Sequence, residues 1–297
     1  MDFFLLATDI LLLLFWVRLW SAPRGDFHFN PFLSAPTRLT DRVLSFLQPV
    51  LPLPERLLAL LVLVFLLGFR AVAVDRLAGG PPWSVTIGLF FTFMPHAVGL
   101  HGALAFSLLD FLLFVARLWS LYLLVQLLTP VPRHDRASQA FAVAARPFSE
   151  IPGWLRLFAL AAAQVAIMYA LTGAGVLVRH VPEGMPAPPA LPGPGAPWLI
   201  SVLYHGWLAA LSAADALLAA RACLVAFILG SLASLLLQSA ALNAICNEGI
   251  AVLLGRFGRR APVGMFDFSP VLYYFGVSIL HWLVAIGVLW LMSVVRV

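Results

Sequence analysis

The run LLALLVLVFLLGFRAVAV at residues 57–74 decides the fold class of this chain. It approaches the roughly 20 mostly apolar residues that a helix needs to cross the hydrocarbon core of a bilayer. The run is rich in Leu and Ala, which are good helix formers. A membrane-spanning barrel strand would instead alternate apolar and polar residues. The stretch therefore predicts a transmembrane helix.

Five more apolar runs of this kind occur, and their residue ranges are 3–20, 103–128, 154–178, 207–237 and 271–295. The 297 residues are 62% apolar and only 10% charged, whereas a soluble domain is about 25% charged. We therefore expect an all-α membrane protein with six transmembrane helices and no soluble domain. The stretch 83–100 is also apolar but contains Pro95 and Gly99. We interpret it as an interfacial or broken lead-in helix, with a seventh span as the alternative.

Arginine supplies every basic residue, 18 in all. Three connections between the runs are rich in it, with Arg24, Arg38, Arg42 and Arg56 in the first, Arg133, Arg136 and Arg146 in the second, and Arg256, Arg259 and Arg260 in the third. Short loops rich in Arg stay cytoplasmic, so we expect both termini outside. Arginines beside spans favour anionic lipid headgroups as partners. A nucleic-acid reader would cluster them on a soluble face, so we expect no nucleic acid.

The chain repeats itself at intervals of about a third of its length. VRLWS at 17–21 recurs as ARLWS at 116–120, and the His-Gly pairs at 101–102 and 205–206 precede Arg117 and Arg221 by the same distance. We infer three repeated hairpins, each a span, a connection and a returning span. The expected units are 1–80, a degenerate second unit with the lead-in helix over 81–180, and 198–297. A Pro/Gly-rich external loop over 181–197 separates the last two.

Each cytoplasmic connection contains an amphipathic stretch. The apolar positions are Leu39, Val43, Phe46, Leu47 and Val50 in the first, Phe141, Ala145 and Phe148 in the second, and Ile250, Leu253, Leu254 and Phe257 in the third. This helical period predicts helices lying in the headgroup plane. The alternative is a loop helix packed on the bundle.

Among the charged residues inside the expected spans, five are candidates for an intramembrane polar network: Asp9, Asp110, Arg117, Asp215 and Arg221. A charge at the bilayer centre costs at least about 2.5–3.5 kcal/mol, so each should find a partner or face a wet cavity. Asp110 and Arg117 are two turns apart on one helix, about 10 Å, so we predict pairing between units. The network is either a structural lattice between repeats or a polar path for an ion or solute.

Two segments resemble the YggT family of small bacterial and plastid membrane proteins. The first unit carries Arg18-Leu19-Trp20, then Asn30-Pro31 before its amphipathic helix, and the third carries Arg259-Arg260 and Asp267-Phe268-Ser269-Pro270. Family members usually have one or two units, so this chain would be an extended, three-repeat variant. The middle unit keeps almost none of the motif.

The motif residues also have physical roles that do not depend on the family. Asn30 can hold a turn ahead of the helix that Pro31 begins. Asp267 or Ser269 is placed to cap the last span, with Pro270 in its first turn.

The resemblance implies a bacterial inner-membrane protein tied to assembly of membrane complexes, cell division or envelope homeostasis. We therefore expect a non-catalytic scaffold that contacts other membrane proteins. The rival function is a small channel or transporter using the intramembrane Arg and Asp residues, and a weaker rival is a membrane enzyme. No catalytic or metal-binding motif is present in the sequence. Plastid relatives suggest haem, with His101, His205 and His281 as candidates, but their spacing favours packing histidines, so we expect no cofactor.

Overall fold

The computed structural model describes residues 2–21, 30–77, 84–95, 99–128, 136–179, 192, 197–255, 262–263 and 266–294. Five of its helices are long and apolar enough to cross a membrane. They are α3 (Glu55–Leu77), α4 (Leu100–Leu128), α6 (Gly153–Ala174), α7 (Trp198–Leu236) and α9 (Ser269–Val294). Each coincides with a predicted span, and α1 (Asp2–Trp20) is helical where the first span was predicted. The architecture is therefore that of a mostly helical, multi-pass membrane protein.

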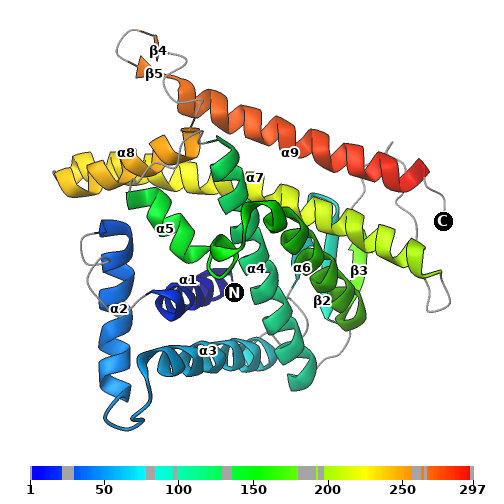
Figure 1. Ribbon diagram of the computed structural model, residues 1–297, viewed down its shortest axis with the longest axis horizontal. Coiled ribbons are helices and arrows are strands. Elements are labelled where there is room, and N and C mark those ends of the chain that lie inside the picture. The colour runs from blue at the N-terminus through cyan, green and yellow to red at the C-terminus, as the bar shows by residue number, and fades with distance from the viewer. Residues whose placement is uncertain are drawn as a thin grey trace.

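Three short helices connect the long ones: α2 (Pro31–Leu47), α5 (Arg136–Ala144) and α8 (Ala240–Leu254). A 3-10 turn, η2 (Phe148–Glu150), follows α5. The long helices pack in sequence-adjacent pairs, α1 with α3, α4 with α6, and α7 with α9. The short helices form a row in which α5 contacts both α2 and α8. Figure 1 shows this row on one side of the molecule.

Helix α4 is the centre of the assembly. It packs against α3, α6 and α7, and so contacts all three helix pairs. In Figure 1 it runs between α3 below and the α7–α9 pair above. Helix α4 therefore connects the three helix pairs to one another.

Within the stretch 83–100 the described residues 84–95 form no helix, so the prediction of a lead-in helix or seventh span there is wrong. The stretch contains β1 (Val85–Ile87) and β2 (Phe91–Pro95), joined by a tight turn. The expected span 154–178 also ends early, because Gly175–Arg179 forms β3. The three strands make an antiparallel sheet in the order β1-β2-β3, with Ile87 opposite Phe91 and Phe93 opposite Leu177. A second pair, β4 (Pro262–Val263) and β5 (Phe266–Asp267), precedes α9.

The sheet forms because its residues suit strands. Val85, Ile87, Phe91 and Phe93 are β-branched or aromatic, and such side chains favour the pleated surface. All four are buried in one cluster with residues of α4, α6, α7 and α9. Non-helical backbone at membrane depth is tolerated only where protein or a wet cavity covers it. The sheet satisfies this condition because the helices enclose its hairpin.

Helices α2 and α8 present their apolar faces differently. On α2, the predicted stripe points away from the protein and leaves Leu39, Val43 and Phe46 exposed. The opposite face, which includes Leu33 and Leu44, is buried. On α8, Leu253 and Leu254 are buried against neighbouring helices. The third amphipathic stretch is thus a helix packed on the bundle, whereas the first keeps an exposed apolar face.

Helix α7 is unusually long, with 39 residues. At 1.5 Å per residue it measures about 58 Å, roughly twice the thickness of a bilayer core. Its C-terminal half packs with α8 through two glycine contacts. A Cβ on Gly249 would lie 2.6 Å from the Phe227 ring, and one on Gly230 would lie 2.7 Å from Cys246 Sγ. The missing side chains let the two helices approach closely.

Candidate functional site

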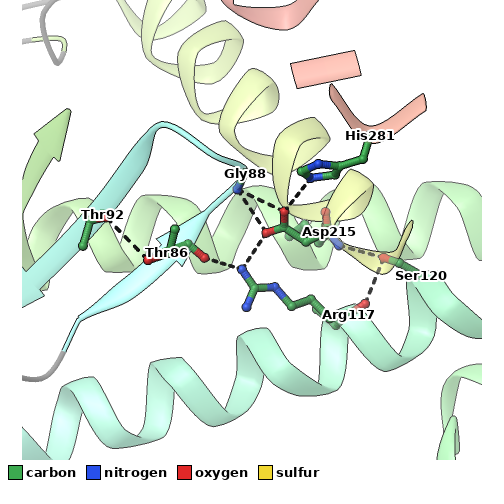
Figure 2. Close-up of polar contacts among 9 residues, drawn as sticks. Thr86, Gly88, Thr92, Arg117, Ser120, Asp215 and His281 are labelled. Carbon is green, nitrogen blue, oxygen red and sulfur yellow. Dashed lines mark hydrogen bonds and ion pairs between the residues drawn. The ribbon is translucent and has the colours of Figure 1, made fainter. Parts of the chain in front are cut away.

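Asp215 is the most buried of the five predicted intramembrane charges. Its side chain is 8% exposed. Gly88 N lies 3.1 Å from both carboxylate oxygens, Arg117 Nη2 donates to Oδ2 at 2.7 Å, and His281 Nε2 is 3.2 Å from Oδ1. A carboxylate only accepts, so all three partners are donors here. Figure 2 shows them converging from the β1–β2 hairpin, α4 and α9 onto α7.

The hairpin turn positions its donor through backbone conformation. Gly88 has φ +58°, in the left-handed region that glycine enters without a Cβ penalty. This turn directs its N–H at Asp215. Arg117 Nη2 also donates to Thr86 O at 2.6 Å. The guanidinium therefore joins the hairpin to α7 while neutralising the carboxylate.

The arrangement leaves Asp215 no unused oxygen. Oδ1 is in contact with Gly88 and His281, and Oδ2 with Gly88 and Arg117. A buried ion pair is tolerated when further hydrogen bonds satisfy its remaining lone pairs. We describe these four residues as the Asp215 cluster. The cluster holds α4, α7, α9 and the β1–β2 hairpin together, with both oxygens of the carboxylate engaged.

A second ionic group joins α1, α3 and α4. Arg70, on α3, has a side chain only 3% exposed. Its Nη1 lies 3.1 Å from Asp9 Oδ1, and its Nη2 pairs with Asp110. We call these three residues the Arg70 triad. Two carboxylates share one guanidinium, so each depends on the same cation.

Helix α4 links the two groups because it carries both Asp110 and Arg117. Each finds its partner on another helix, Arg70 of α3 for Asp110 and Asp215 of α7 for Arg117. Polar side chains on α4 add further bonds to its neighbours. Ser107 Oγ donates to Leu67 O at 3.1 Å, and Ser120 Oγ accepts from Gln164 Nε2 at 3.0 Å.

Arg221 does not join either group. Its guanidinium lies over the Tyr274 ring, 5.3 Å from the centroid, and Nη1 is 3.3 Å from Ser278 Oγ. A cation over an aromatic face is stabilised by the ring quadrupole. Arg221 therefore adds a second polar contact between α7 and α9, beside that of Asp215 with His281.

Arg18, at the end of α1, pairs with acidic side chains of α2 and α3. Its Nη2 lies 2.7 Å from Asp41 Oδ1 and 3.1 Å from Glu55 Oε2. Both acidic side chains are partly exposed, at 43% and 49%. Exposed pairs contribute about 0–1 kcal/mol each. Arg18 thus orients α2 and the start of α3 more than it stabilises them.

Asn30 has two roles at the start of α2. Its Oδ1 accepts from Phe32 N at 3.1 Å and caps the helix, and its Nδ2 donates to Arg136 O at 2.7 Å. On the other side of α5, Glu248 Oε1 accepts from Ala137 N at 3.1 Å. The first turn of α5 is therefore held from α2 and α8 together.

The other motif residues lie at element ends. Pro31 opens α2, and Trp20 closes α1, where its carbonyl accepts from Arg146 Nη1 at 2.9 Å. Ser269 is the first residue of α9, and Pro270 lies in its first turn. Arg259, Arg260 and the side chain of Asp267 lie outside the described residues, as does nearly all of the predicted loop 181–197.

Sequence reasoning missed several residues that complete these groups. Arg70 lies within the most apolar run, and its role becomes visible only beside Asp9. Gly88 and Glu248 act through backbone bonds that no motif reports. For His281 the sequence suggests packing or, less favoured, haem ligation, and neither points to Asp215, which its Nε2 faces. A systematic search for charges inside every span would have found Arg70.

No family model, curated protein or solved structure matches this chain. The site must therefore be interpreted from its own chemistry. Among the described residues, no group of three or more His, Cys, Asp or Glu side chains has the geometry of a metal site. The contacts of His205 are with Thr172 and Ser201.

Replacing Gly88 with alanine should lower the free energy of unfolding by about 1–2 kcal/mol, the cost of a left-handed backbone with a Cβ. The new Cβ would meet Leu211 at 3.5 Å, an ordinary contact, so backbone conformation dominates. Gly276→Ala in α9 is the matched control, since its Cβ has open space. Denaturant titration in mixed micelles measures both. Equal stability of the two variants would contradict the turn geometry.

Replacing Asn30 with aspartate separates its two roles. Aspartate caps helices as well as asparagine, so a capping role alone predicts no loss. It cannot donate to Arg136 O, however, and leaving that partner unsatisfied costs about 1–3 kcal/mol. We expect Asn30→Asp to destabilise in the same denaturant titration. Ser239→Asp is the control, because Ser239 Oγ only caps α8 by accepting from Leu242 N at 3.3 Å. An Asn30→Asp protein as stable as this control would exclude the link to α5.

Proposed function

We propose that this chain is a non-catalytic scaffold or assembly factor of the bacterial inner membrane, YggT-like in design, for membrane complexes, division or envelope homeostasis. The observation that carries the proposal is the closure of the Asp215 cluster. A transport path needs a carboxylate that exchanges partners with an ion or solute. Both oxygens of Asp215 are instead engaged by donors from three other segments. The intramembrane charges then serve to fix the bundle.

The surface of α2 supports a binding role. Phe46, near its end, is 79% exposed, and Leu39 and Val43 continue the same face. Arg38 and Arg42 are also exposed on this helix. An apolar stripe flanked by arginines suits anionic lipid headgroups or the interfacial part of another membrane protein. We assign contact with lipid and partner proteins to this face.

The proposal also includes the orientation of the chain in the membrane. The alternation of long, short and long helices supports three repeated hairpins, and the arginine-rich connections would be cytoplasmic with both termini outside. Reporter fusions at the two ends test this orientation. A cytoplasmic C-terminus would contradict it.

The decisive experiment compares native assemblies. The tagged full-length protein, solubilised in mild detergent, should elute in a complex larger than its own monomer and contain other membrane proteins. Phe46→Glu should release the monomer, because it buries a charge in the contact. Gln48→Glu, an exposed site on the same helix end, adds the same charge beside the stripe and should leave the complex intact.

A transport assay tests the rival function in parallel. The protein reconstituted in liposomes should conduct no cation, anion or proton above empty vesicles. A monomeric protein whose ion flux disappears in Asp215→Asn would overturn the scaffold proposal in favour of a channel or transporter.

A further inference from the structure

A groove of about 990 Å³ lies between α6 and the first turns of α7, apart from both ionic groups. One wall is a row of small and apolar side chains on α6, including Phe158, Ala162 and Ala166. The other wall includes Trp198 and Val202 of α7. Its volume lies at the upper end of the range typical of small-molecule sites.

The groove has one polar end. His205, Thr172 and Ser201 line it there. His205 is buried, and its Nδ1 donates to Ser201 O at 2.5 Å because a carbonyl can only accept. Its Nε2 lies 2.9 Å from Thr172 Oγ1. The Tyr169 ring lies 5.2 Å from the imidazole, centroid to centroid. The imidazole is thus held in one orientation beside two hydroxyl groups.

The rest of the wall is long and uncharged. From Phe158 to Thr172 the helix rises about 20 Å, at 1.5 Å per residue. No Asp, Glu or Arg is among the residues that line the groove in the described structure. Among the described lining residues a charged headgroup would meet no counter-ion, and burying an unpaired charge is costly. The lining therefore selects a neutral head and an extended apolar tail.

We propose that this groove binds a neutral lipid with a carbonyl or hydroxyl head group. The head lies at Thr172, Ser201 and His205, and the apolar chain follows the small side chains of α6. Ser201 Oγ can donate to a carbonyl or an alcohol oxygen, whereas Thr172 Oγ1, whose one proton goes to His205 Nε2 or to Tyr169 O, can accept from an alcohol. The exposed aromatic side chains of Trp198 and Tyr169 flank the entrance, as aromatic residues do where a membrane meets water. Quinones, prenols and acylglycerols share this chemistry.

Native mass spectrometry of the full-length protein in neutral detergent tests the proposal. Two probes are added separately, a decyl-chain benzoquinone and a diacylglycerol, with phosphatidylglycerol as the reference for non-specific lipid. We expect at least one neutral probe to bind about tenfold more tightly than the reference. The probe that binds identifies the head group.

Three variants separate the groove from the general surface. Ala162→Phe fills it and should weaken the bound probe at least tenfold. Thr172→Val removes one hydrogen bond and should weaken it about fivefold. Ala226→Phe is the matched control, an exposed alanine outside the groove, and should bind as the unaltered protein does.

Two results would overturn the proposal. One is binding of both neutral probes no tighter than phosphatidylglycerol. The other is binding that Ala162→Phe leaves unchanged. Neither result bears on the scaffold function, because the readout is lipid occupancy and not assembly.

Discussion

Replacing Asp215 with alanine is expected to lower the free energy of unfolding by about 3–5 kcal/mol, the range for breaking one side of a buried ion pair. The loss is large because three donors lose their acceptor together: Gly88 N, Arg117 Nη2 and His281 Nε2. The Arg117 charge also loses its counter-ion. Denaturant titration of the purified protein in mixed micelles measures the change.

Glu55→Gln is the control for this variant. Glu55 also pairs with an arginine, Arg18, but its side chain is 49% exposed. An exposed pair of this kind contributes about 0–1 kcal/mol. If Asp215→Ala costs no more than Glu55→Gln, the Asp215 cluster does not stabilise the bundle.

Replacing Arg70 with methionine should destabilise the protein by about 3 kcal/mol, because it leaves two partly buried carboxylates without their shared cation. Asp9 and Asp110 would then face each other across α1 and α4 with no positive charge between them. The side chain of Arg70 is 3% exposed, so water does little to replace it. The same unfolding titration measures this loss.

A triple variant distinguishes charge from packing in the Arg70 triad. Arg70→Met combined with Asp9→Asn and Asp110→Asn removes all three charges, and it should recover most of the lost stability, since an ion-pair group replaced as a whole is often tolerated. If the triple variant is as unstable as Arg70→Met alone, the arginine contributes through its packing and the electrostatic account is wrong.

The sequence predicts the long helices correctly, because each of them is encoded in one continuous apolar run. The run at 57–74 predicts α3 because its length and composition suffice, and the other long apolar helices follow in the same way. The exposed stripe of α2 follows from helical periodicity. The energetic cost of a charge in lipid also led to partners on other helices for Arg117 and Asp215, although it did not specify which residue meets which.

The missing parts depend on contacts between distant segments. A short apolar run such as 85–93 has no periodicity that separates a buried strand from a buried helix. The run pairs with itself as a hairpin, and β3, more than eighty residues later, completes the sheet. The role of the turn at Gly88 is visible only in the structure, where the N–H of Gly88 donates to the Asp215 carboxylate. Arg70 stands alone in an apolar run. Its partners, Asp9 and Asp110, lie on other helices, so the run itself does not indicate the triad.

The most direct test of the account is a double-mutant cycle between Arg117 and Asp215, which tie α4, the hairpin and α7 together. Unfolding free energies are measured for Arg117→Met, Asp215→Ala and the double variant in the same mixed micelles. We predict a coupling energy of about 2–3 kcal/mol, within the range for directly contacting residues, so that the double variant loses less stability than the sum of the two single variants. A coupling energy near zero would show that Arg117 and Asp215 do not stabilise each other. It would contradict the role of the Asp215 cluster in fixing the bundle, on which the scaffold proposal rests.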